Sequence, residues 1–188
     1  MSDAERQKWN QRYAEHGTTA PQPSPWLLTL DSRLPREGRT LDVAGGNGRH
    51  ALWLARRGLA VTLCDISTTG IALAMEAARQ EGLALTPLAV DLAETGLPAG
   101  PWDLILCFHY LERDVYRAFS AGLSPGGTLV VVHPTLKNLE RHPRPGRPFL
   151  LDEGELPTLL TGLTLLHSEE GWLSEGRHEA RIIARRES

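Results

Sequence analysis

The residues best suited to chemistry begin in a glycine-rich segment, LDVAGGNGRH, at residues 41–50. Gly45, Gly46 and Gly48 have no Cβ, so the backbone can turn tightly there and a ligand can approach it closely. A helix expected to begin at Arg49 adds unpaired amide groups and the positive end of its dipole. A strand, a glycine turn and a helix N-terminus in this order are typical of a nucleotide-like ligand site.

Three carboxylates accompany the expected strands of this region. Asp42 lies in the strand before the glycine turn, and Asp65 and Asp91 end the next two strands. Ligands of open α/β sheets bind at the carboxyl ends of the strands, so we expect these acids and Cys107 to face one crevice. A carboxylate at Asp65 is placed to accept hydrogen bonds from both ribose hydroxyls.

Two nucleoside cofactors fit this pattern. The spacing of Gly46, Gly48 and Ala51 matches the relaxed fingerprint of a dinucleotide site. An NAD enzyme needs a further region for its substrate, however, and 188 residues leave little room for one. S-adenosylmethionine has no pyrophosphate, and it gives Asp91 the task of accepting a hydrogen bond from the adenine amino group. We therefore favour S-adenosylmethionine and keep NAD as the alternative.

The elements that position these residues alternate between strand and helix. Strands that are apolar on both faces and alternate with helices indicate a parallel sheet covered on both sides. The expected fold class is α/β, a Rossmann-like three-layer sandwich whose cofactor-binding core spans residues 39–132. The expected strands are 40–44, 60–64, 84–90, 102–107 and 128–132, and the helices are 49–57, 68–81 and 112–122.

Residues 1–38 are expected to form an N-terminal helical cap on this core. A polar helix over residues 1–16 would place Trp9 and Tyr13 on one face. A second helical pattern runs over residues 26–34, after a proline-rich stretch that cannot be regular structure.

The C-terminal part departs from the alternation of strands and helices. Residues 133–148 are expected to form a long surface loop, and residues 152–160 a short helix. Too few residues join the expected strands 163–168 and 179–185 for a crossover helix, so these should pair antiparallel. A length of 188 residues suits one domain over residues 1–188 rather than two.

With these motifs, the chain resembles the class I S-adenosylmethionine-dependent methyltransferases. The resemblance covers residues 39–132 and, more loosely, the whole chain, through the segments LDVAGGNG, LCDIS, AVDLAE, WDLILCFHYL and LSPGGTLVVV. The segments WNQRY, GRHALWLARRG and FLLDEGEL make it most similar to the small tellurite-resistance-type and thiopurine-type enzymes. The resemblance implies a seven-stranded, mostly parallel sheet in the order 3-2-1-4-5-7-6, with strand 7 antiparallel.

The resemblance also implies which residues hold the cofactor. The glycine turn and Asp42 would surround its amino-acid end, Asp65 would hold its ribose, and Asp91 would read its adenine. Two N-terminal aromatic residues would close over it, although simple packing of their helix onto the core is the alternative. The cofactor-binding residues so implied are Trp9, Tyr13, Asp42, Ala44, Gly45, Gly46, Gly48, Asp65, Ile66, Asp91, Leu92, Cys107 and Phe108.

Apolar neighbours complete the implied site. Ile66 and Leu92 would contact the adenine, and Cys107 with Phe108 would line the site beneath the sulfonium. Ala44 stands where the family usually has glycine. We expect alanine to be tolerated there if its φ is negative.

His109 is the candidate catalytic residue, because it follows the fourth expected strand, where the substrate usually lies in this fold. An oxygen or nitrogen acceptor needs a general base, whereas an ionised thiol or reduced chalcogen does not. His133, which follows the fifth expected strand, is a second candidate. His133 and His142 have no third histidine or cysteine beside them, so we expect no metal site. Three nearby arginines, Arg141, Arg144 and Arg147, are expected to lie in a solvated loop. Alternatively, this loop covers an anionic substrate.

Composition narrows the class of protein further. Hydrophobic residues make up 41% and charged residues 23%, which excludes disordered and fibrous classes. A net charge of −3 argues against binding to a nucleic-acid backbone. No apolar run is long enough to cross a membrane, and the polar first residues carry no secretory signal. Two cysteines indicate a reducing compartment, so we expect a cytoplasmic protein.

The predicted function is an enzyme that transfers a methyl group from S-adenosylmethionine to a small molecule by in-line displacement. Its expected partners are that acceptor and, at most, a second copy of the chain in a homodimer. A non-catalytic S-adenosylmethionine-binding module and an NAD-linked oxidoreductase are the alternatives.

Overall fold

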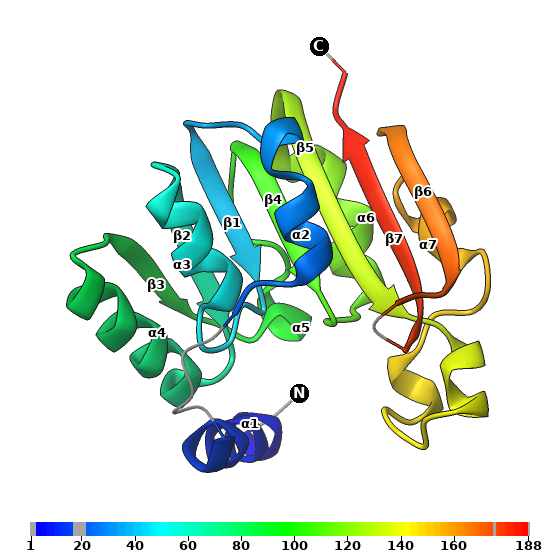
Figure 1. Cartoon of the computed structure of the whole chain (residues 1–188), viewed down its shortest axis with the longest axis horizontal. Coiled ribbons are helices and arrows are strands. Elements are labelled where there is room, and N and C mark those ends of the chain that lie inside the picture. The colour runs from blue at the N-terminus through cyan, green and yellow to red at the C-terminus, as the bar shows by residue number, and fades with distance from the viewer. Residues whose placement is uncertain (1–2, 17–21, 175, 188) are drawn as a thin grey trace.

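The computed structural model describes residues 3–16, 22–174 and 176–187. Its strands are β1 (Arg39–Val43), β2 (Ala60–Asp65), β3 (Leu85–Ala89), β4 (Trp102–Phe108), β5 (Leu123–Pro134), β6 (Thr164–Trp172) and β7 (His178–Arg185). They form one seven-stranded sheet in the order β3-β2-β1-β4-β5-β7-β6 (Figure 1). Strands β1 to β5 pair in parallel, and β7 is antiparallel to both of its neighbours. The predicted strand order and the antiparallel last strand are confirmed.

Helices cover both faces of the sheet, so the three-layer prediction is confirmed (Figure 1). One face carries α2, α3 and α4, and the other carries α5, α6 and α7, each with its own buried apolar cluster. The helices are α1 (Asp3–His16), α2 (Pro25–Thr29), α3 (Arg49–Arg56), α4 (Thr68–Glu81), α5 (Leu92–Thr95), α6 (Arg113–Gly122) and α7 (Glu155–Leu159), with 3₁₀ turns η1 (Asp31–Arg33), η2 (Leu136–Glu140) and η3 (Arg147–Phe149).

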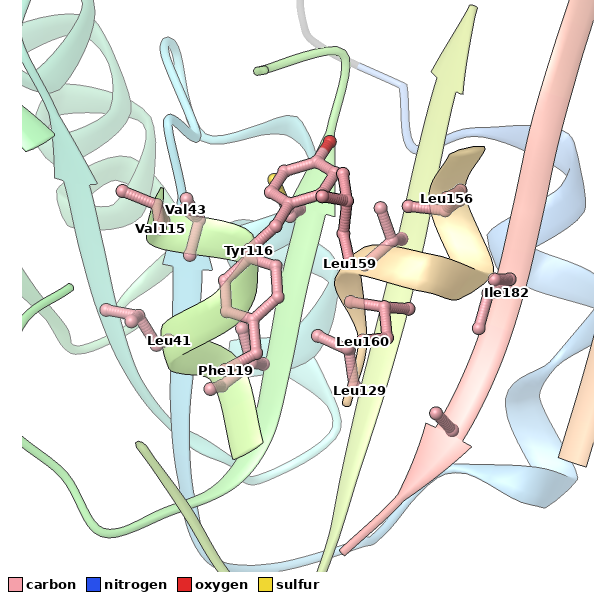
Figure 2. Close-up of a cluster of buried hydrophobic side chains, with 14 of the residues drawn as sticks. Leu41, Val43, Val115, Tyr116, Phe119, Leu129, Leu156, Leu159, Leu160 and Ile182 are labelled. Carbon is pink, nitrogen blue, oxygen red and sulfur yellow. The ribbon is translucent and has the colours of Figure 1, made fainter. Parts of the chain in front are cut away.

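The central strand β4 shows why its sequence is apolar throughout. Successive side chains of a strand point to opposite faces. Ile105 and Cys107 therefore join the cluster under α6, where Tyr116 and Phe119 lie over the sheet (Figure 2). Leu106 joins the cluster on the opposite face. Because both faces are covered by helices, no position in the middle of β4 is left for a polar residue.

Helix α4 has the bounds that the sequence predicts. Ser67 caps it, because its Oγ accepts a hydrogen bond from Gly70 N at 3.0 Å. Gly82 ends it in the left-handed conformation, with φ of +67°. A polar cap and a C-terminal glycine are strong local signals, which explains the agreement.

The second predicted helix, residues 26–34, is wrong in its extent. Helix α2 ends at Thr29 and is followed by η1. Leu30 N donates to Leu27 O, three residues earlier, so the chain winds more tightly there. The tighter winding accompanies the burial of Leu27, Leu30 and Leu34 against the sheet.

The predicted surface loop at 133–148 is wrong at its start. Strand β5 continues to Pro134, because His133 and Pro134 pair with Ala180 and Glu179 of β7. His133 is therefore buried rather than part of a surface loop. Strand β3 is one residue shorter at each end than the predicted strand 84–90. Its Pro87 is tolerated because β3 lies at the edge of the sheet.

The described residues contain no helix with both the length and the apolar character that a membrane crossing requires. Residues 1, 2 and 17–21 of the expected N-terminal cap lie outside the described part of the chain.

Candidate functional site

The glycine turn joins the carboxyl end of β1 to the start of α3. Gly46 and Gly48 have φ of +58° and +80°, which glycine adopts without strain. A Cβ on Gly48 would lie 2.7 Å from the Cβ of Ala74 on α4. A Cβ on Gly45 would lie 2.6 Å from Asp42 Oδ2. The glycines are thus required for close packing of α3 and α4 as well as for the turn.

Ala44 adopts φ of +52°, so the condition under which we expected alanine to be tolerated is not met. The turn must begin directly after β1, and Gly45 N is already committed to Cys64 O of β2 at 3.1 Å. A non-glycine residue in the left-handed region costs about 1–3 kcal/mol. The surrounding sheet therefore holds Ala44 in a conformation that its own side chain disfavours.

Asp42 lies beneath the turn and is almost fully buried, with 1% of its surface exposed. Its Oδ2 accepts a hydrogen bond from Ala51 N of α3 at 3.1 Å. Burial raises the pKa of Asp42 to about 7, although the Arg49 charge and the Ala51 amide act in the opposite direction. The carboxyl group can therefore gain or lose a proton near neutral pH.

Asp65 ties the end of β2 to the glycine turn. Its two oxygens accept hydrogen bonds from Gly46 N at 2.8 Å and from Ser67 N at 2.7 Å. Burial raises its pKa, against the opposing effect of these amide donors. Each carboxylate oxygen has a second lone pair, so both can still accept from hydroxyl groups of a ligand.

Asp91 follows β3 and caps α5, accepting a hydrogen bond from Ala93 N at 3.0 Å. Its other oxygen, Oδ2, is buried and has no hydrogen-bond partner within the described chain. An unsatisfied buried acceptor costs about 1–3 kcal/mol. The free lone pairs of Oδ2 therefore fit a ligand that brings a donor, such as an adenine amino group. The apolar neighbours Ile66 and Leu92 are half-buried and buried, respectively.

Helix α1 lies over the glycine turn. The ring of Tyr13 contacts it so closely that a Cβ on Gly46 would overlap the phenol oxygen, and a Cβ on Gly70 would lie 2.9 Å from Tyr13 Cδ2. Burial raises the pKa of Tyr13 to about 12, with the Asp65 charge adding to the effect. The ring centres of Trp9 and Tyr13 are 6.2 Å apart.

Asn10 is a residue of this cap that sequence reasoning missed. Its Oδ1 accepts hydrogen bonds from Ser67 Oγ at 2.8 Å and from Thr69 N at 3.1 Å. It thereby fastens α1 to the first turn of α4. No spacing rule in the sequence selects this asparagine, because its partners lie far along the chain.

Arg49 was also not assigned a role from the sequence. It is the first residue of α3, and its charge interacts with Asp42, Tyr13 and Glu179. Burial lowers the pKa of its guanidinium, which the neighbouring acids partly offset. Asp42 and Arg49 together provide opposite charges beside the glycine turn.

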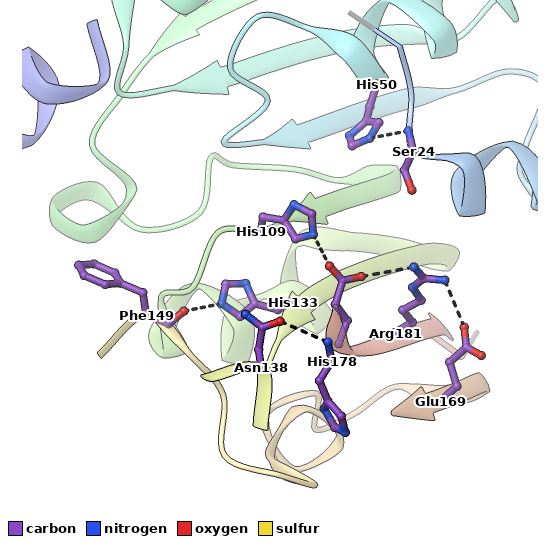
Figure 3. Close-up of polar contacts among 10 residues, drawn as sticks. Ser24, His50, His109, His133, Asn138, Phe149, Glu169, His178 and Arg181 are labelled. Carbon is purple, nitrogen blue, oxygen red and sulfur yellow. Dashed lines mark hydrogen bonds and ion pairs between the residues drawn. The ribbon is translucent and has the colours of Figure 1, made fainter. Parts of the chain in front are cut away.

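His109 follows β4 at the same edge of the sheet and has φ of +61°. Its Nε2 lies 2.9 Å from Oε1 of Glu179, at the start of β7 (Figure 3). The histidine side chain is 31% exposed and that of Glu179 only 4%. Glu179 was not singled out in the sequence, since only the pairing of β5 with β7 brings it there.

The two predicted residues at the end of β4 point to opposite faces. Cys107 lies in the core under α6, and burial raises its thiol pKa. Phe108 packs against the ring of His50, with centres 4.2 Å apart. The structure therefore does not bring Cys107 and Phe108 together on one surface.

The second histidine candidate and the arginine candidates make other contacts. His133 is buried, its Nε2 donates to Phe149 O at 3.0 Å, and burial lowers its pKa to about 4. Arg141 stacks on Trp172, 3.8 Å from the ring centre, while Arg144 and Arg147 are exposed.

A methyltransferase domain family matches residues 40–127. The tRNA 5-carboxymethoxyuridine methyltransferase of Escherichia coli (strain K12) is 33% identical over an alignment of 116 residues, which covers 57% of this chain and 44% of that protein. The ubiquinone biosynthesis O-methyltransferase of Caulobacter sp. (strain K31) is 33% identical over an alignment of 120 residues, which covers 58% of this chain and 47% of that protein. The chain thus spans less than half the length of these curated relatives.

Among solved structures, TehB from Haemophilus influenzae superimposes with a TM-score of 0.74 at 21% identity, over 95% of this chain and 67% of that one. This likeness shows a shared fold. Residues 40–127 therefore match a methyltransferase domain family, and the fold of the chain is similar to that of TehB.

Proposed function

We propose that this protein transfers a methyl group from S-adenosylmethionine to a small-molecule acceptor. The observation that carries the proposal is the set of carboxylates that accompany β1, β2 and β3, in which buried Oδ2 of Asp91 has no partner among the described residues. A nucleoside offers the missing donors, namely an amino group for Asp91 and hydroxyl groups for Asp65.

The charged pair beside the turn suits the amino-acid end of the same cofactor. Asp42, when ionised, accepts from an ammonium group, and Arg49 donates to a carboxylate. Ile66 and Leu92 supply apolar contact for the adenine. Trp9 and Tyr13 on α1 cover the turn and exclude water.

Bound S-adenosylmethionine supplies a methyl group that its sulfonium already activates. The protein's contribution is to align an acceptor atom with that methyl group and to keep water away. Alignment of this kind can supply roughly 7–11 kcal/mol of barrier reduction. His109 lies at the carboxyl end of β4, where it can contact an acceptor and remove its proton.

A small molecule is the acceptor class that we favour. The curated relative from Caulobacter is named as an O-methyltransferase of ubiquinone biosynthesis. The relative from Escherichia coli is named for a modified uridine of tRNA, and a chain with a net charge of −3 is a poor match for a nucleic-acid backbone.

Two measurements test this function. Calorimetry with S-adenosylmethionine, S-adenosylhomocysteine and NAD should show binding of the first two and none of NAD. A radiolabelled methyl-transfer screen over phenols, thiols, amines, chalcogen oxyanions and tRNA should then identify a small-molecule acceptor. Binding without any transfer would instead favour a non-catalytic module, and transfer to tRNA alone would contradict the small-molecule class.

A further inference from the structure

His109 is held at two points on neighbouring strands. Its backbone N donates to Val132 O of β5 at 2.8 Å, and its ring Nε2 meets Glu179 of β7 at 2.9 Å. Its φ of +61° is a conformation that a histidine rarely adopts without such restraint. Strands β5 and β7 therefore set the orientation of the ring (Figure 3).

Glu179 is built to remain an anion. Its second oxygen lies 3.3 Å from Nη2 of Arg181, whose Nη1 lies 3.8 Å from Glu169 (Figure 3). Burial alone would raise the pKa of Glu179, but the hydrogen bond from His109 and the Arg181 charge outweigh it and lower the pKa.

The charge of Glu179 decides the tautomer of His109. An ionised carboxylate can only accept hydrogen bonds, so Nε2 of His109 must carry a proton. In the neutral ring, the lone pair then lies on Nδ1. The same logic applies wherever a buried carboxylate orients a basic imidazole.

Two other histidines lie close enough to His109 to interact with its charge, His50 on α3 and His133 on β5. Nε2 of His50 accepts from Ser24 N at 3.3 Å, and Nε2 of His133 donates to Phe149 O. Both residues are buried, and burial lowers the pKa of each. Of the three, His109 alone combines a carboxylate partner with an exposed side chain.

We propose that Glu179 is a positioning residue that holds His109 as a general base, and that the methyl acceptor is a group that must lose its proton, for which we take a hydroxyl group. The inference rests on the proposed function and narrows its substrate class. An acceptor that is already ionised, such as a thiolate, would make no use of this pair.

The balance of the step follows from these roles. Nδ1 of His109 takes the hydroxyl proton while the acceptor oxygen forms a bond to the methyl carbon. The bond from that carbon to sulfur breaks, and its electron pair stays on sulfur. The ring, transiently cationic beside the Glu179 anion, then returns its proton to water.

Replacing Glu179 by glutamine separates positioning from general structure. A glutamine can offer either its oxygen or its NH₂ group to Nε2, so it no longer selects the tautomer. Glu169→Gln is the matched control, because Glu169 pairs with the other end of Arg181 and lies 3.4 Å from His167 rather than from His109. Melting temperature and S-adenosylhomocysteine affinity are measured for both variants.

The acceptors are a series of substituted phenols of increasing acidity, with benzenethiol as the ionised reference. For Glu179→Gln we expect kcat/KM with unionised phenols to fall by roughly 10²- to 10⁴-fold, the range for general acid–base catalysis. The loss should shrink as the phenol becomes more acidic and be smallest for benzenethiol. Glu169→Gln should keep the unaltered protein's values.

Equal losses for phenols and benzenethiol, or no loss at all, would overturn the role of Glu179. If the unaltered protein methylates only benzenethiol and other ionised acceptors, the proposed function stands and the hydroxyl inference fails. If it binds no S-adenosylmethionine, the proposed function itself fails, so the two failures are distinguishable.

Discussion

Asp42, Asp65 and Asp91 accompany three neighbouring strands, yet each carboxylate meets a different set of donors. Asp65 has an amide donor on each oxygen, while Asp91 has one oxygen without a partner in the described chain. Asp42 is buried with one amide donor and has a raised pKa. The three acids should therefore respond differently to substitution.

Asp65→Ala should weaken S-adenosylhomocysteine binding by about 1.5–3 kcal/mol, the range for hydrogen bonds to a charged group. Isothermal titration calorimetry measures the change. Asp103→Ala is a matched control, because Asp103 Oδ2 also accepts from a backbone amide, Arg39 N at 2.8 Å, but at the opposite end of the sheet. Unchanged affinity in Asp65→Ala, or an equal loss in the control, would refute the ribose assignment.

Asp42 should make stability depend on pH. Its pKa is raised to about 7 in the folded state, so the folded state holds its proton more tightly than the unfolded state. The free energy of unfolding should therefore fall as pH rises from about 4 to about 7. Asp42→Asn removes this titration, so it should raise the free energy of unfolding, relative to the unaltered protein, more at pH 8 than at pH 4.5.

Urea unfolding at pH 4.5 and pH 8 measures this difference. Asp103→Asn is the control, since Asp103 accepts a comparable amide hydrogen bond away from the site. A stability change in Asp42→Asn that is the same at both pH values would contradict the raised pKa of Asp42.

At the scale of elements, α1 is the part of the site that depends most on a few contacts. It reaches the sheet through Tyr13 over the glycine turn and through Asn10 on the first turn of α4. All described residues of α1 are exposed or half-buried. The docking of α1 should therefore be separable from the folding of the sheet.

Asn10→Ala should release α1 without unfolding the core. The two lost hydrogen bonds contribute about 0.5–1.5 kcal/mol each, and Ser67 Oγ and Thr69 N remain accessible to water once α1 leaves. Hydrogen exchange should accelerate in α1 far more than in β4. S-adenosylhomocysteine should dissociate faster.

Gln11→Ala is the control for this variant, because Gln11 is exposed and its amide pairs with Glu15 of the same helix. Exchange in α1 that is as slow in Asn10→Ala as in Gln11→Ala would show that Asn10 does not fasten the helix.

At the scale of the whole molecule, one sheet serves two buried clusters and also forms the floor of the site. Both clusters draw residues from β2, β4, β5 and β7, so neither can form without the sheet. Unfolding should be a single cooperative transition. Ligand binding at the edge of the sheet should then stabilise the whole chain.

S-adenosylhomocysteine at a hundredfold excess over its Kd should add about 2.7 kcal/mol to the free energy of unfolding. For a chain of this size the melting temperature should rise by roughly 5–10 °C, since each kcal/mol corresponds to about 2–4 °C. Differential scanning calorimetry measures the shift. NAD at the same concentration should leave the melting temperature unchanged, and an equal rise with NAD would contradict the cofactor assignment.

The sequence by itself determined the alternation of strands and helices, the bounds of α4 and the place of the glycine turn. These depend on signals within a few residues, such as apolar runs, a serine cap and closely spaced glycines. Asp42, Asp65 and Asp91 were found for the same reason, because each accompanies a recognisable strand. The positive φ of Ala44, by contrast, has no local signal in the sequence, since the closing of β1 onto β2 sets it.

Only the tertiary structure decided which distant side chains meet. Asn10 reaches Ser67, and Glu179 reaches His109, because α1 lies over α4 and because β7 enters the sheet next to β5. His133 became a buried strand residue through the same pairing. Contacts between residues far apart in sequence have no local signal, and the free energy of packing the whole sheet selects them. The order of the strands in the sheet therefore places Glu179 beside His109, the proposed base.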